Sequence, residues 1–111
     1  MSKQTPKLFL EDMLEAISKI ERYIEGLDEK KFKSDEKSVD AIVRNLEIIG
    51  EAANQLPKDF ISKYPEVEWR KIIGLRNRVI HDYFGIDLDI IWQIIQKDLP
   101  VLKTNLAKIK L

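Results

Sequence analysis

The scarcity of glycine and proline most constrains how this chain can fold. Only four of each interrupt 111 residues, and the segments between them carry apolar residues at the three- and four-residue spacing of amphipathic helices. No stretch alternates apolar and polar residues for long enough to indicate a β-strand. The pattern therefore predicts an all-α protein, and the length fits a single domain over residues 1–111.

The periodicity predicts four main helices and one short connecting helix. In chain order, their expected ranges are about 6–25, 35–55, 58–64 (the connecting helix), 67–83 and 87–111. Long helices joined by short connections pack most simply as an up-and-down bundle. We therefore expect this architecture.

Local signals refine the ends and irregularities of these helices. The charged stretch 28–37 is expected to be a solvated loop or a single helical turn. Gly85 is expected to stop the helix over 67–83, and Asp87 to cap the last helix. Pro100 lies inside the apolar stripe of that last helix. Because the stripe continues in phase beyond it, we expect a kink there and not an end.

The helix over 35–55 carries two apolar faces. The broad one suits the core of the domain, whereas Ala41, Ile48 and Ala52 form a thinner strip on the other side, bordered by Arg44 and Glu51. We interpret the strip as a contact with a second copy of the chain in a two-fold dimer. Arg44 and Glu51 could pair with a neighbouring charge, line a cleft or face water.

Composition excludes several kinds of site. Lys plus Arg and Asp plus Glu each number 19, so coating of nucleic acid by bulk charge is not expected. The chain has no cysteine and one histidine, which rules out disulfides, thiolate zinc sites and a multi-histidine metal site. No signal peptide or membrane span is evident. We expect a cytoplasmic protein without a metal, a cofactor or a membrane contact.

The segment 69–83 carries the most informative polar residues. On a regular helix Arg76 would fall in the middle of an apolar arc, and a guanidinium stays charged in proteins. It could be a structural arginine paired with an acid such as Glu51. Alternatively, it could bind an anion at the floor of a cleft. Arg70, Lys71, Arg76 and Arg78 make this segment a local basic patch in a protein of zero net charge.

His81 is the side chain best suited to proton transfer near neutral pH. A helix would stack it on Asn77, four residues earlier, although a single histidine near a helix end is often only structural. A regular helix also places His81 about 140° around the axis from Arg76. The two converge only if the helix loosens near His81 or a second chain contributes to the site.

Cleavage of RNA at the 2′-hydroxyl is a reaction that would suit one arginine and one histidine without metal ligands. The reaction needs a base for that hydroxyl, an acid for the leaving 5′-oxygen and a cation for the phosphorane. His81 could supply proton transfer, and Arg76 could stabilise the charged phosphoryl oxygens. RNA carries its own nucleophile, so this chemistry needs no metal. It is one hypothesis among several that the residue types allow.

The stretch Arg76-Asn77-Arg78-Val79-Ile80-His81-Asp82-Tyr83 matches an Arg-polar-x(3)-His-x-Tyr motif. This motif resembles that of HEPN-domain proteins of the HepT-like branch. The resemblance extends to RNLEIIGEAANQLP at 44–57 and to the C-terminal half of the chain, and covers roughly residues 8–111. It implies a helical bundle that dimerises and acts as a metal-independent ribonuclease toxin.

The resemblance also implies roles for individual residues. Arg76 and His81 would be the catalytic pair, with Asn77 supporting the site. The partner would be an antitoxin, a nucleotidyltransferase of the MNT type, that neutralises the toxin by adding AMP to Tyr83. Such an anionic adduct two residues from His81 would obstruct a phosphate-binding cleft.

Two alternatives without catalysis remain open from the sequence. The same cleft could hold a nucleotide or the nucleotidyltransferase in a regulatory complex. The chain could also be a purely structural dimerisation bundle, which would leave Arg76 unexplained.

Overall fold

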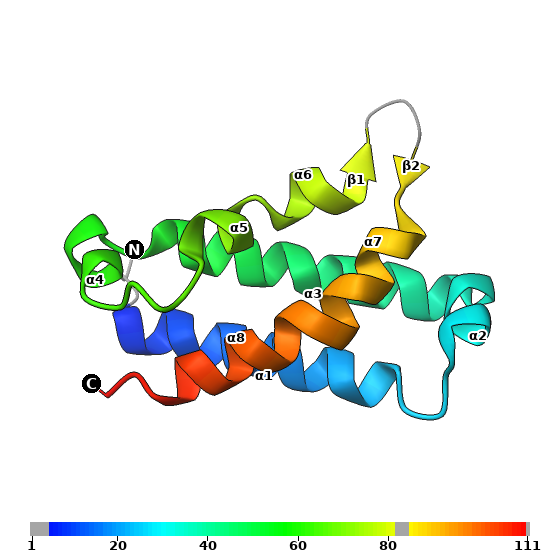
Figure 1. Ribbon diagram of the computed structural model, residues 1–111, viewed down its shortest axis with the longest axis horizontal. Helices are drawn as coiled ribbons and strands as arrows, with labels where there is room; N and C mark the ends of the chain where they lie inside the picture. Colours follow the sequence, from blue (N-terminus) through cyan, green and yellow to red (C-terminus); the bar gives the residue numbers. More distant parts are fainter. Residues whose placement is uncertain (1–4, 82–84, 111) are drawn as a thin grey trace.

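Two long antiparallel helices, α1 (Pro6–Tyr23) and α3 (Glu36–Gln55), form the base of the fold (Figure 1). The computed structural model describes residues 5–81 and 85–110. Side-chain oxygens of Thr5 and Asp35 accept hydrogen bonds from backbone N–H groups in the first turns of α1 and α3, which satisfies donors that a helix start leaves free. The expected ranges 6–25 and 35–55 are thus confirmed to within a few residues.

The helix α2 (Glu29–Ser34) connects these two helices. The expected single turn is present, but a wholly solvated surface is wrong, because Phe32 is fully buried and packs 5.5 Å from the ring of Trp92. Lys33 bonds to Asp89 and to Glu29, and these two hydrogen bonds raise the pKa of Lys33. α2 is therefore fastened to the start of the C-terminal helix by one aromatic and one charged residue.

The C-terminal helical segment is continuous but irregular. It consists of α7 (Leu88–Gln93), a π-helical turn η1 (Ile94–Asp98) and α8 (Leu99–Ala107), and Asp87 caps it by accepting from the N–H of Ile90. The N–H of Leu99 donates to the C=O of Ile94, five residues back. Pro100 has no N–H and crowds the preceding turn, which accounts for the wider turn just before it. The helix continues past Pro100, as expected, and the irregularity there is a widened turn.

The short helix α4 (Lys58–Ser62) follows Pro57, as expected. Beyond it, the predicted single helix over 67–83 is wrong. The chain instead forms α5 (Trp69–Ile73), breaks at Gly74, forms α6 (Leu75–Val79) and enters the antiparallel strands β1 (Ile80–His81) and β2 (Gly85–Ile86). Figure 1 shows this segment crossing above α3, with the strands at its far end.

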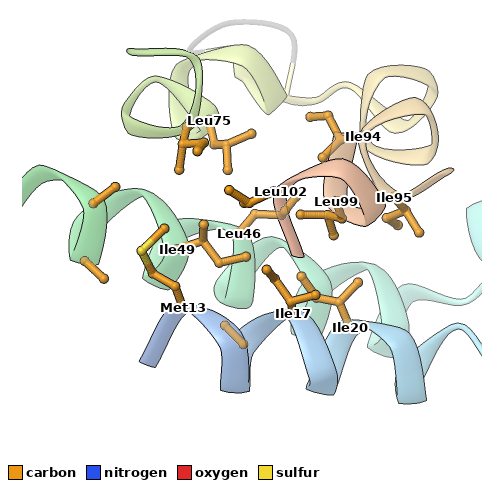
Figure 2. Close-up of a cluster of buried hydrophobic side chains, with 14 of the residues drawn as sticks. Met13, Ile17, Ile20, Leu46, Ile49, Leu75, Ile94, Ile95, Leu99 and Leu102 are labelled. Carbon is orange, nitrogen blue, oxygen red and sulfur yellow. The ribbon is translucent and has the colours of Figure 1, made fainter. Parts of the chain in front are cut away.

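The core lies where α1, α3, α6 and the C-terminal segment meet. Figure 2 shows Met13, Ile17 and Ile20 of α1 facing Leu46 and Ile49 of α3, with Leu75, Ile94, Ile95, Leu99 and Leu102 closing the cluster. All ten are buried. The all-α bundle predicted from the sequence is confirmed. Within the described ranges, no helix is long and apolar enough to cross a membrane.

Candidate active site

The helices α5 and α6 are held against α3 by a close backbone approach. Gly50 of α3 is buried, and a Cβ atom there would lie 3.1 Å from the carbonyl oxygen of Ile72. At the other end of α5, the Trp69 side chain is buried and its Nε1–H donates to the carbonyl of Tyr64 at 3.0 Å. These contacts set the base from which α6 projects.

The helix α6 buries one side and exposes the other. Leu75 and Val79 are buried, whereas Arg76 and Asn77 are exposed. The expected position of Arg76 within an apolar arc is wrong, because that arc assumed one unbroken helix. Gly74, with φ −86° and ψ 8°, departs from helical geometry and changes the rotation of all that follows. Arg76 thus faces solvent in the single chain.

His81 lies on an extended segment and not on a helix. α6 ends at Val79, Ile80 adopts φ −112° and ψ 120°, and the backbones of Ile80 and His81 pair with Ile86 and Gly85. The expected stacking of His81 on Asn77 in one helix is therefore wrong. One of the two conditions under which Arg76 and His81 could converge, a loosening of the helix near His81, is present, and their convergence stays a prediction.

The ends of the paired strands are fastened to the bundle. The N–H of Asp87 donates to the carbonyl of Val79 at 2.8 Å, and the same residue caps α7. Gly85 has φ +79°, a conformation that glycine adopts without strain. Tyr83, the expected site of AMP addition, lies outside the residues that the structure describes.

The basic residues of this region differ in their partners. Two of them form ion pairs: Nζ of Lys71 lies 3.8 Å from Oε2 of Glu68, and Nη1 of Arg78 lies 3.2 Å from Oδ2 of Asp98. Arg76 forms no ion pair with any residue in the ranges 5–81 and 85–110, Glu51 included. Arg44 and Glu51 are both exposed. Arg76 is thus an accessible cation that the described part of the chain leaves uncompensated.

The Ala41/Ile48/Ala52 strip does not form the open face that the sequence suggested. Ala52 is buried within the single chain, and Ile48 is half-buried against the core. α5 lies against the side of α3 that carries Gly50, which a regular helix places opposite this strip. Ala52 and part of Ile48 are therefore covered within the single chain.

The ion pair between Arg78 and Asp98 was not predicted from the sequence. Nη1 of Arg78 donates to Oδ2 of Asp98 at 3.2 Å, joining α6 to η1. The two residues are twenty apart in the chain, so no helical spacing rule connects them. Only the packing of the two segments brings them together.

Comparison with known proteins decides the family. The profile described as "Ribonuclease HepT-like" matches residues 13–109. The chain belongs to the HepT-like ribonuclease family. This confirms the family that the motif indicated and, with it, the class of enzyme, a ribonuclease.

Similar proteins span nearly the whole chain. A Thermococcus cleftensis protein named "probable ribonuclease HepT" is 39% identical over 97% of this chain and 98% of its own length. A Methanocaldococcus jannaschii protein whose name describes it as an RNase is 41% identical over 93% of this chain and 94% of its own length. No solved structure matches the chain at a significant level.

Proposed function

We propose that this HepT-like ribonuclease is the toxin of a toxin–antitoxin pair and cleaves RNA without a metal, through Arg76 and His81. The observation that carries the proposal is the exposed Arg76, which has no ion-pair partner within the described ranges. It lies on a helix whose opposite side is buried, and the backbone segment bearing His81 follows directly. An exposed, uncompensated guanidinium is suited to a phosphate.

Each residue has a defined task in the proposed reaction. Arg76 binds the non-bridging oxygens of the scissile phosphate and stabilises the charge that grows on them as the 2′-oxygen attacks. His81 transfers a proton, either from the 2′-hydroxyl or to the leaving 5′-oxygen. Asn77 is exposed beside Arg76 on α6 and supports the site by hydrogen bonding. The leaving 5′-oxygen departs as a hydroxyl, and the 2′-oxygen closes a cyclic phosphate.

The proposal includes a two-fold homodimer that brings two copies of this segment together. The reaction needs a base for the 2′-hydroxyl and an acid for the 5′-oxygen, and one histidine cannot be both at once. A second chain would supply the other proton-transfer group. Ile73 and Ile86 are 36% and 38% exposed and lie on the segments before and after Arg76. Both would be covered by such a contact, with RNA bound in the cleft between the protomers.

Regulation follows from the last position of the motif. A nucleotidyltransferase of the MNT type would add AMP to Tyr83 and so act as the antitoxin. The adduct places a phosphate two residues along the chain from His81. It would occupy the cationic cleft and repel the RNA backbone. The toxin would then stay inactive without being degraded.

The decisive experiment is RNA cleavage in EDTA by the purified chain, compared with Arg76→Ala and His81→Ala. We expect cleavage to survive chelation, to yield cyclic-phosphate ends and to fall by at least about 100-fold in each variant. Pre-incubation with ATP and the nucleotidyltransferase should abolish cleavage of the parent chain but not that of Tyr83→Phe.

Co-expression provides a second readout in cells. The chain should inhibit growth when produced alone and be harmless beside the active nucleotidyltransferase. Full cleavage by His81→Ala would refute the catalytic assignment. Absence of cleavage and toxicity, together with tight binding to the nucleotidyltransferase, would instead support a regulatory binding module.

A further inference from the structure

The ion pair between Arg78 and Asp98 joins the proposed catalytic segment to the C-terminal helix. Arg78 lies on α6, two residues after Arg76, and Asp98 is the last residue of η1. The Arg78 and Asp98 side chains are 33% and 34% exposed. The pair is therefore partly shielded from solvent. In such a position a charge-assisted hydrogen bond is stronger than on an open surface.

A pocket adjoins this pair. It has a volume of about 90 Å³ and lies between α5, α6 and the C-terminal segment, and its lining includes Ile72, Leu75 and Leu102 as well as the ion pair. Leu75, Leu99 and Leu102 are buried in the core between the two segments, but apolar contacts have no preferred direction. The polar link at the edge of the pocket supplies a defined separation.

The shortness of α6 makes this link more important. α6 spans Leu75–Val79, between the break at Gly74 and the start of β1. A helix of about one turn has too few internal hydrogen bonds to be stable alone, so its orientation depends on its contacts with the rest of the fold. Any rotation of α6 moves Arg76 and the start of the strand that carries His81.

The wide turn of η1 determines where Asp98 lies. Because the Leu99 N–H bonds to the carbonyl five residues back, the end of η1 is rotated relative to a regular α-helix. Asp98 then meets Arg78, while Ile94, Ile95 and Leu99 remain buried. Wide turns of this kind often occur at functional sites.

We infer that Arg78 and Asp98 are positioning residues for RNA cleavage, which orient α6 so that Arg76 and His81 meet the same phosphate. The inference rests on the proposed function of those two residues. In this arrangement Arg78 does not contact the RNA. Its charge is used within the protein, against Asp98.

The test compares Asp98→Asn and Arg78→Gln with the parent chain, because the first variant breaks the pair and keeps the arginine. If the pair positions α6, both variants should lower kcat by roughly 10- to 100-fold with little change in KM, since small displacements of reacting groups have effects of this size. The exchanged pair Arg78→Asp with Asp98→Arg should recover part of the loss.

A matched control is Glu21→Gln, which removes the ion pair of Glu21 with Lys103 between α1 and α8, at 3.0 Å. It should leave kcat and KM unchanged. All variants are assayed well below their Tm values, so that folded enzyme is compared with folded enzyme. A loss confined to Tm, with parental kcat, would show that the pair is only structural and would overturn the inference.

The outcomes also separate this inference from the proposed function. If Asp98→Asn keeps parental kcat and Arg78→Gln raises KM in a salt-dependent manner, Arg78 binds RNA directly and the inference is wrong. If Arg76→Ala and His81→Ala cleave RNA normally, the proposed site itself is wrong. Inactive His81→Ala together with fully active Asp98→Asn rejects the positioning role alone.

Discussion

At the scale of single residues, the absence of a side chain at Gly50 is as important as the presence of one at Arg76. Gly50 lets α3 approach the backbone of α5 so closely that a methyl group would press on the Ile72 carbonyl. Sequence periodicity could place Gly50 inside a helix, but it could not show what lay opposite. Periodicity also could not show that Arg76 is exposed, because its exposure depends on the break in the helix at Gly74.

We expect Gly50→Ala to destabilise the protein by about 1–3 kcal/mol, since the crowded atom belongs to the backbone and has little freedom to move. This loss should exceed the roughly 0.5–1 kcal/mol that alanine gains in a helix interior. Urea unfolding at a fixed protein concentration measures the difference. Asn54→Ala, at an exposed position of the same helix, is the control and should have little effect. A stabilised Gly50→Ala would mean that α5 shifts at negligible cost.

At the scale of elements, the sequence predicted α1, α3 and the short α4 well, but it predicted neither the burial of α2 nor the division of 67–83 into two helices and a strand. α1 and α3 have stripes that repeat over several turns and caps at Thr5 and Asp35. α2 depends on one aromatic residue among charges, and such an isolated residue has no period to detect. The break in 67–83 was not predicted because the spacing of apolar residues does not report backbone geometry. The β-branched residues Val79 and Ile80 before Gly85 are nevertheless typical of a hairpin.

We expect Phe32→Ala to destabilise the fold by about 3–5 kcal/mol, because it removes a fully buried ring and leaves a cavity beside Trp92. Leu8→Ala, at a position that is 43% exposed, should change stability by less than about 0.5 kcal/mol. Denaturant unfolding of both variants gives the comparison. Equal effects would show that α2 is not anchored through its aromatic residue.

At the scale of the whole molecule, the proposed dimer predicts a dependence of activity on assembly. Ile73→Lys places a charge on the expected contact while leaving the fold intact, since Ile73 is already 36% exposed. We expect a monomer in analytical ultracentrifugation and a loss of RNA cleavage of at least about 10-fold. Val101→Lys, at a 56% exposed position on α8, should keep both size and activity. A fully active monomeric Ile73→Lys would place the complete site within one chain.

The hydrogen bond between Asp87 and Val79 also has an evolutionary consequence. The Asp87 nitrogen lies 2.8 Å from the Val79 oxygen, so the bond joins the two residues that flank residues 80–86. Asp87 also caps the helix that follows. The two attachment points keep their spacing whatever the sequence between them. Sequence changes within residues 80–86 would therefore alter the proposed site and leave the bundle that carries it unchanged.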